Sequence, residues 1–192
     1  MRVSKEKAEQ NKGNLLDAAS RLFRARGVDG VGVAEVAKEA GLTHGALYAH
    51  FPSKDALAAA AFTQGFAGSL ASIEAWAAGR SPSFSDYLDA LFSVRARDRV
   101  AEGCPMAASA SEASRHGPAL SESFASAFED EVALIEASLD RALPAAERRR
   151  TAVATLAAQI GAIAVARAVS AHDNALSEEV LKATRAVIAR GA

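Results

Sequence analysis

The residues of this chain that are best suited to surface chemistry lie within one short stretch. Thr43, His44, Tyr48 and His50 bring hydroxyl, imidazole and phenol groups together, and Gly45 stands between them. Such side chains exchange hydrogen bonds with phosphate oxygens and base edges. A glycine at position 45 would let a sugar-phosphate backbone or a thymine methyl group approach closely. The stretch therefore points to contact with nucleic acid.

Elsewhere the sequence shows no catalytic or metal-binding pattern. The four histidines have no metal-ligand spacing, and three residues separate Glu112 from His116 where a Glu-x-x-His motif has two. Gly27, Gly30 and Gly32 follow a predicted helix instead of a strand, so they imply no dinucleotide-binding loop. We expect no metal, no cofactor and no enzymatic activity. A helical-bundle catalyst without recognisable residues is the alternative.

Two short helices are predicted to carry the polar stretch. Apolar residues from Val33 onward recur at helical spacing, Gly41 suits the end of that helix, and Thr43 can cap a second helix over 46–51. Leu47 would anchor the second helix inward and leave its outer face free. Two helices joined by a glycine-containing turn form a helix-turn-helix, whose second helix enters the major groove of DNA.

The run from Ala40 to Leu57 resembles the signature of TetR-type transcriptional regulators, and Leu15–Gly27 is similar to that family's first helix. Eight positions fall in the family's register together: Gly41, Gly45, Leu47, Tyr48, His50, Phe51, Lys54 and Leu57. The resemblance implies a repressor that binds a palindromic DNA operator as a homodimer and is released by a small apolar or amphipathic effector. It also implies which residues contact DNA: Thr43, His44, Gly45, Tyr48, His50 and Lys54.

Three positions depart from the family pattern. Gly32 stands where a Ser or Thr usually caps the second helix, Ala34 where an outward basic or polar residue is usual, and His44 where Lys is frequent. Because each departure removes a hydrogen-bonding or charged group, we expect fewer charge contacts with DNA than is usual. Among the remaining candidates, we expect His44 to read bases and Lys54 to contact a phosphate.

Composition and charge favour a cytoplasmic all-α protein. Half of the 192 residues are hydrophobic, many of them Ala, and no segment shows sustained alternation. The net charge is −1, but residues 1–55 hold nine Lys and Arg against seven Asp and Glu, which suits a DNA-binding head. A single cysteine forms no internal disulfide, and the N-terminus lacks a signal-peptide core. The most apolar run, 151–166, is too short to span a bilayer, so no membrane insertion is expected.

Two domains are expected. Residues 1–53 would form a three-helix DNA-binding domain, which begins with a loose arm where Arg2, Lys5 and Lys7 are candidate DNA contacts. Residues 54–192 would form a helical effector-binding and dimerisation domain, and the whole chain would contain about nine helices. The helices predicted in the second domain span about 54–78, 84–100, 105–115, 117–139, 144–171 and 174–190.

Aromatic and aliphatic residues recur at helical spacing through the second domain. In relatives the corresponding helices enclose a ligand cavity, so the resemblance implies an effector pocket; packing as plain core is the alternative. The candidate pocket residues are Phe62, Phe66, Leu88, Phe92, Cys104, Met106, Phe124, Phe128 and Ile160. The candidate polar partners of an effector are Tyr87, Arg95, His116 and Gln159.

The last two predicted helices are candidates for self-association. The helix over 144–171 is rich in small residues and apolar over most of its circumference, which is more apolar surface than one monomer would bury. The helix over 174–190 offers a second apolar face, and both resemble the family's dimer bundle. The candidate interface residues are Leu156, Ile160, Ile163, Val180 and Val187. A single-chain bundle with a fully internal core is the alternative.

Cys104 precedes Pro105 at the predicted start of a helix. The positive end of the helix dipole would lower the pKa of the Cys104 thiol. Some TetR-type repressors sense oxidants or electrophiles through a cysteine, so modification of Cys104 is an alternative route of release, and an inert buried cysteine is the other possibility. A helix-turn-helix adaptor that acts through protein contacts is the alternative to a DNA-binding regulator.

Overall fold

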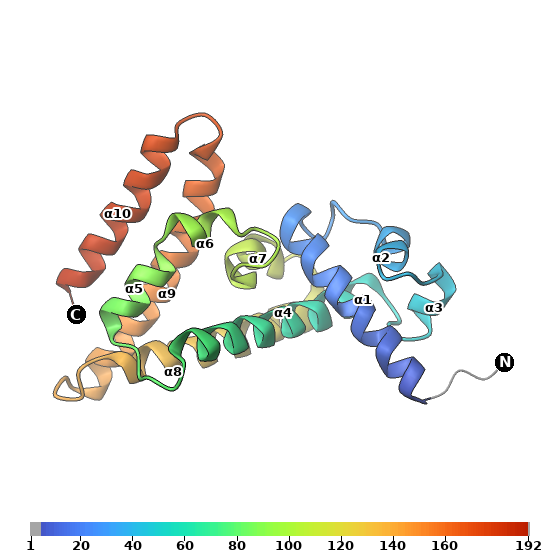
Figure 1. The fold of residues 1–192 in the computed structure, drawn as a ribbon, viewed down its shortest axis with the longest axis horizontal. Coiled ribbons are helices and arrows are strands. Elements are labelled where there is room, and N and C mark those ends of the chain that lie inside the picture. The colour runs from blue at the N-terminus through green and yellow to red at the C-terminus, as the bar shows by residue number, and fades with distance from the viewer. Residues whose placement is uncertain (1–4, 192) are drawn as a thin grey trace.

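The computed structural model describes residues 5–191, and within them it contains helices and no strand, as expected for an all-α protein (Figure 1). Ten helices follow one another in the described residues: α1 (Lys5–Arg26), α2 (Val33–Glu39), α3 (His44–Tyr48), α4 (Lys54–Ala77), α5 (Phe84–Leu91), α6 (Val94–Asp98), α7 (Pro105–Ala113), α8 (Gly117–Ser138), α9 (Ala145–Ser170) and α10 (Asn174–Arg190).

Helices α1, α2 and α3 form a head at one end of the molecule (Figure 1). Leu15, Val36, Leu47 and Leu57 are fully buried in its core, which the first turns of α4 complete. The apolar residues whose spacing predicted these helices are therefore the residues that pack the helices of the head together. As expected, the polar faces of α2 and α3 remain outside.

The turn between α2 and α3 depends on Gly41. This residue has a φ of +69°, a left-handed conformation that glycine adopts without steric cost. The N–H of Leu42 then donates to the carbonyl of Ala37 at 2.8 Å, which satisfies one of the last carbonyls of α2. The turn directs the chain into α3 at a large angle, so that α3 lies at the outer edge of the head (Figure 1).

Helix α4 crosses the molecule and connects the head to the body (Figure 1). Leu57 belongs to the core of the head, whereas Phe62 and Phe66 belong to the core of the body. Gly65 lets α4 approach α1 closely, because a Cβ at this position would stand 2.5 Å from Oγ of Ser20. The same helix is therefore packed in both cores, which makes it the mechanical link between them.

Helices α5 to α10 form the body. Helix α8 packs along α4, where the rings of Phe62 and Phe124 stack with their centroids 5.7 Å apart. Helices α9 and α10 pack side by side at the end of the molecule farthest from α3 (Figure 1). Met106 and Leu156 are fully buried at the centre of the body, and Leu181 joins α10 to α9.

Three predicted helix boundaries were wrong. The helix expected over 84–100 is divided into α5 and α6, because the hydroxyl of Ser93 accepts the N–H of Ala96 at 3.0 Å and caps a new helix. Helix α3 spans His44–Tyr48 instead of 46–51, and its last turn tightens where the amides of His50 and Phe51 both donate to one carbonyl. Lys5 belongs to α1 and not to a loose arm, while Arg2 lies outside the described residues.

Helices α4 and α9 are long and apolar enough, by length and composition alone, to cross a membrane. The run over 151–166 is by itself too short to span a bilayer, but it forms part of the longer helix α9, which has 26 residues. Both helices contribute fully buried residues to the cores described above, including Leu57 of α4 and Leu156 of α9. Their hydrophobicity is thus used, at least in part, in packing within the protein.

Candidate nucleic-acid interface

Helix α3 presents the polar stretch at the surface. Thr43, His44 and Gly45 are exposed, and Tyr48 is 46% exposed. Leu47 is fully buried, so it anchors α3 to the head as predicted. The outer face of α3 is therefore exposed in this protomer.

Local contacts order the side chains on this face. The hydroxyl of Thr43 accepts the N–H of Ala46 at 3.3 Å and caps α3, which leaves its own hydrogen atom free for donation. The rings of His44 and Tyr48, one helical turn apart, meet edge to face with centroids 5.0 Å apart. Among the described residues no atom lies within 4 Å of a Cβ built on Gly45, so the space beside this glycine is open.

His50 lies two residues after the end of α3, and Lys54 is the first residue of α4. Both are partly buried, and the hydroxyl of Ser53 accepts the N–H of Ala56 at 3.1 Å to cap α4 directly beside Lys54. The cap fixes where α4 begins and therefore where the backbone of Lys54 lies. Five of the six predicted DNA-contacting residues thus lie on α3 or within two residues of it, and the sixth opens α4.

Helix α2 contributes little charge to the same side. Gly32 caps it without a side-chain hydrogen bond, as expected, and Ala34 is exposed. Its acidic residues are neutralised by α1, since Glu35 pairs with Arg26 at 2.6 Å and Glu39 pairs with Arg21 at 3.1 Å. The ion pairs hold α2 against α1, but the two arginines are then engaged within the head.

The predicted pocket residues pack together as core. Seven of them join one cluster in the body: Phe62, Phe66, Cys104, Met106, Phe124, Phe128 and Ile160. Leu88 and Phe92 join a neighbouring cluster against α9 and α10. A cavity of about 10 Å³ lies beside this core, lined in part by Phe62 and Leu120, and its size suits about one water molecule. A larger ligand would need these helices to separate.

Two polar side chains, Glu131 and Gln159, are buried in the body. Glu131 of α8 is 6% exposed, and burial raises the pKa of its carboxyl to about 7. Gln159 of α9 is 1% exposed, and its Oε1 has no hydrogen-bond partner among residues 5–191. Sequence reasoning singled out Gln159 but missed Glu131. The available signal was the position of Glu131 beside Val132 on the apolar stripe of α8.

The other predicted polar partners are dispersed. Tyr87 is nearly buried on α5, and burial, followed by the charge of Glu131, raises its pKa. Arg95 is exposed on α6. His116 lies at the junction of head and body, where its Nε2 is 3.5 Å from Asp29 and its Nδ1 is 3.5 Å from Asp55. Of the four predicted polar partners, only Tyr87 and Gln159 therefore lie within the body, where they could contact a ligand.

Cys104 caps α7, and Pro105 is its first residue, as predicted. The expected direction of its pKa was wrong. Burial raises the pKa of the Cys104 thiol to about 12, and the charge of Glu131 acts in the same direction. Hydrogen bonds from the amides of Met106 and Ala107 at the start of α7 oppose this rise, but the loss of water outweighs them.

The head is fastened to the body by polar contacts. Both carboxylate oxygens of Glu112 on α7 accept the N–H of Val28, at 3.0 and 3.2 Å. Nη1 of Arg24 on α1 donates to the carbonyl of Gly103 at 2.9 Å. A movement of α7 or of the loop before it would therefore be transmitted directly to α1.

The predicted interface residues differ in where they point. Leu156 and Ile163 are 0% and 1% exposed, so they belong to the protomer's own core and not to an outer face. Ile160 and Val180 are partly buried, and Val187 is 60% exposed. The exposed face of α9 carries Ala154, Ala157, Gly161, Ala164, Val165 and Ala168, and all of these except Ala168 belong to the small and apolar residues from which sequence reasoning predicted self-association of this helix.

Two family models match the sequence. The model of bacterial regulatory proteins of the tetR family matches residues 15–61, and the model of the LmrA/YxaF-like transcriptional regulator C-terminal domain matches residues 82–178. The HTH-type transcriptional regulator AcrR of Shigella flexneri is 43% identical over 56 residues, which are 29% of this chain and 26% of AcrR. That match thus spans about a quarter of the relative's length.

Solved structures resemble the whole chain. A TetR-family transcriptional regulator from Cytophaga hutchinsonii has a TM-score of 0.73 at 22% identity, covering 99% of this chain and 98% of that one. The regulator FadR from Bacillus subtilis, in complex with stearoyl-CoA, has a TM-score of 0.65 at 13% identity, covering 94% and 99%. At these identities the likeness concerns the fold.

Proposed function

The chain belongs to the TetR family of transcriptional regulators, and from this premise we propose that it is a repressor which binds a palindromic operator as a homodimer. We further propose that a small apolar or amphipathic effector releases it from DNA. The single observation that carries the proposal is the exposed polar face of α3, where Thr43, His44, Gly45 and Tyr48 surround a fully buried Leu47.

The proposed contacts divide into two kinds. His44 stands on the outer face of α3 and would reach base edges, which gives discrimination among sequences. Lys54, Tyr48, His50 and Thr43 would contact phosphates, which positions the head without reading sequence. Gly45 would let the duplex approach closely.

Two alanine variants test this division. Fluorescence anisotropy would measure the affinity of each variant for a duplex selected from genomic DNA and for a scrambled duplex of the same length. His44→Ala should lose about 1–3 kcal/mol on the selected duplex and little on the scrambled one. Lys54→Ala should weaken both alike and reduce the salt dependence by about one ion. Equal losses on both duplexes for both variants would refute the assignment.

The domain boundary is proposed at the start of α4, with residues 1–53 as the DNA-binding domain and 54–192 as the effector-binding and dimerisation domain. The cap at Ser53 supports a boundary there, because it marks the first residue of the linking helix. Leu57 nevertheless packs in the head core, so an isolated head would need at least the first turns of α4.

Self-association is proposed through α9 and α10. The small residues exposed on α9 let a second helix approach closely, and Val187 and Leu176 of α10 are 60% and 43% exposed beside them. Val187→Glu should place a charge in the interface and shift light scattering toward the monomer. Ala125→Glu, at an exposed position on α8, is the matched control. A chain that scatters as a monomer at every concentration would exclude the dimer.

The effector is proposed to enter the aromatic core of the body, where Phe62, Phe66, Phe124 and Phe128 pack against α7 and α9. The complex of FadR with stearoyl-CoA shows that a protein with this fold can hold an amphipathic ligand. Stearoyl-CoA is therefore a suitable first probe. Trp76, the only tryptophan, lies 6.0 Å from the ring of Tyr87 and would report rearrangement of the body by a change in fluorescence.

Two alternatives make different predictions. Modification of Cys104 could release the protein from DNA, but the raised pKa of the thiol disfavours this route. A helix-turn-helix adaptor that acts through protein contacts would show no salt-dependent DNA binding, whereas an operator-binding head would. In this family, the long apolar helices α4 and α9 are interpreted as core helices of a cytoplasmic regulator and not as membrane spans.

A further inference from the structure

A groove of about 350 Å³ lies between the head and the body. Its walls come from α1, α4 and the segment after α6, which supplies Arg99 and Glu102. The volume lies within the range of small-molecule sites in proteins. The groove is separate from the aromatic core of the body and lies on the face of α1 that packs against α4, away from the exposed surface of α3.

Arg24 supplies a partly desolvated guanidinium to this groove. Its Nε donates to the carbonyl of Ser20 at 3.0 Å and its Nη1 to the carbonyl of Gly103 at 2.9 Å. These two bonds fix the plane of the guanidinium, while Nη2 makes no hydrogen bond within the described residues. Burial lowers the pKa of Arg24, with Glu102 opposing the shift, so the charge has lost water without gaining a hydrogen-bonded anion.

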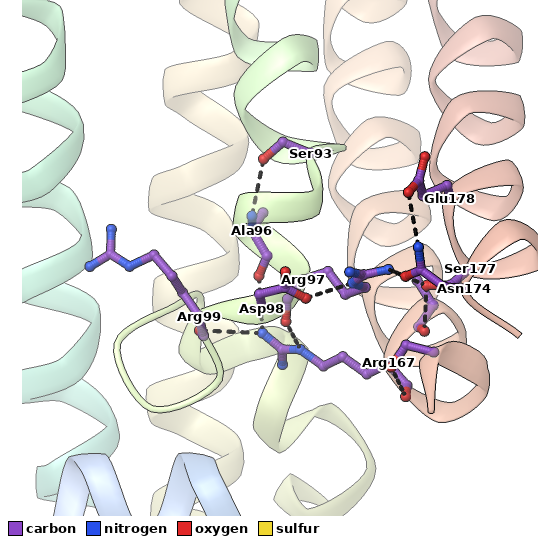
Figure 2. A network of polar contacts seen from close by, with 11 residues as sticks. Ser93, Ala96, Arg97, Asp98, Arg99, Arg167, Asn174, Ser177 and Glu178 are labelled. Atoms are coloured by element: carbon purple, nitrogen blue, oxygen red, sulfur yellow. Dashed lines mark hydrogen bonds and ion pairs between the residues drawn. The ribbon is translucent and has the colours of Figure 1, made fainter. Parts of the chain in front are cut away.

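Arg99 also lines the groove, and the chain around it is held in place (Figure 2). Arg167 of α9 donates from Nε to the carbonyl of Arg97 at 2.8 Å and from Nη2 to the carbonyl of Ala96 at 3.2 Å. The buried guanidinium of Arg97 in turn donates to Ser177 of α10 at 2.9 Å. The backbone that carries Arg99 is thus fastened to α9 and α10.

The side chain of Arg99 takes no part in this network. Figure 2 shows its guanidinium pointing away from Arg97 and Arg167 and toward α4. It makes no ion pair or hydrogen bond within the described residues. Because the backbone that carries Arg99 is already held, an anion would have to order only its side chain.

The remaining polar residues of the groove carry charges of both signs. Arg21 is a third arginine in its wall but is paired with Glu39 at 3.1 Å, and Asp17 and Glu102 are the two acidic residues. Asp17 already accepts Nε2 of Gln64 at 3.3 Å. Ser20, 5% exposed, has a hydroxyl with no hydrogen-bond partner in the part of the chain that the structure describes. An anion with several acceptor oxygens would therefore satisfy donors that the protein leaves unsatisfied.

We propose that this groove is a binding site for a small organic phosphate, whose dianionic phosphate group is held between the guanidinium groups of Arg24 and Arg99. Guanidinium groups bind phosphate with paired, charge-assisted hydrogen bonds. The volume of the groove exceeds that of a phosphate group, so the ligand carries an organic part against Gly65 and Gly68 of α4. Such a ligand would join α1 of the head to a segment anchored on α9 and α10.

The effect of the phosphate ligand on DNA affinity rests on the proposed function, whereas the binding of that ligand to the groove does not. Because the occupied groove would hold α1, α4 and the segment after α6 in one arrangement, the ligand would favour whichever head position that arrangement sets. The test of the site therefore uses the full-length protein without DNA. Failure of that test would leave operator binding untouched, and failure of operator binding would leave the site intact.

Isothermal titration calorimetry in dilute salt tests the site with adenosine 5′-monophosphate, and adenosine is the uncharged control. The phosphate should be required for binding. Arg99→Ala should weaken binding about tenfold or more, equivalent to about 1.4 kcal/mol, whereas Arg95→Ala on the exposed surface of α6 should not. Gly68→Glu, at a position where a Cβ meets no atom within 4 Å, should keep the fold and repel the phosphate.

Three results would overturn the proposal. The first is equal binding of adenosine and its monophosphate, and the second is an equal loss in the Arg95 and Arg99 variants. The third is the absence of heat for both adenosine 5′-monophosphate and inorganic phosphate at millimolar concentration. A loss of binding in Lys54→Ala that matched the loss in Arg99→Ala would instead assign the phosphate to the DNA-binding face, and would also count against the groove.

Discussion

Replacing Glu131 by glutamine should change how the stability of this protein depends on pH. Glu131 is 6% exposed, and burial raises the pKa of its carboxyl from 4.5 to about 7. Between these pH values the folded protein binds the proton and the unfolded chain releases it, so the free energy of unfolding falls as pH rises. Since one pKa unit corresponds to about 1.4 kcal/mol, the total loss is about 3 kcal/mol, complete above about pH 7.

Urea unfolding at a fixed protein concentration measures this loss. Between pH 4 and pH 8 the wild-type chain should lose about 3 kcal/mol relative to Glu131→Gln, because the amide does not titrate. Glu122→Gln, an exposed position on the same helix, should follow the wild type at every pH. Parallel curves for the wild type and Glu131→Gln would refute the burial argument, provided that the slope of free energy against urea is the same.

Three further predictions concern packing and reactivity. Glu112→Ala removes the carboxylate that joins α7 to the head and should lower the free energy of unfolding by about 1–3 kcal/mol, measured by urea. Cys104 should react with iodoacetamide at pH 8 about a thousandfold more slowly than an ordinary thiol, followed by mass spectrometry; a comparable rate would contradict a pKa of about 12. Gly65→Ala places a Cβ 2.5 Å from Ser20 Oγ and should destabilise the protein by about 1–3 kcal/mol, whereas Gly68→Ala, with open space around it, should stabilise it. Equal melting temperatures for the two glycine variants would contradict the close approach of α1 and α4.

The head could be predicted because its signals are local. Thr43 and Ser53 cap helices with their own hydroxyls, and Gly41 supplies the turn that the next residues require. The inward role of Leu47 followed from helical spacing alone. Such features depend on a few neighbouring residues, so the sequence carries them without knowledge of the tertiary fold.

The body was predicted less well because its features depend on tertiary packing. Leu156 faces inward because α8 packs against it, and Ile163 because α5 and α10 do, whereas an all-round apolar helix does not reveal which face is inside. The pKa of Cys104 reflects burial by distant residues, which outweighs the local helix dipole. The hydroxyl of Ser93 accepts the N–H of Ala96 and so begins α6 as a helix separate from α5, which apolar spacing alone does not indicate.

Footprinting of the dimer on a duplex selected from genomic DNA tests the central claim most directly. If two α3 helices are presented by one homodimer, the protected site should contain an inverted repeat whose half-sites lie about 34–36 Å apart, one helical turn. The protection should weaken as salt rises, and Tyr48→Ala should reduce it in both half-sites. Protection of a single half-site, or none in dilute salt, would contradict a dimeric regulator that reads DNA through α3.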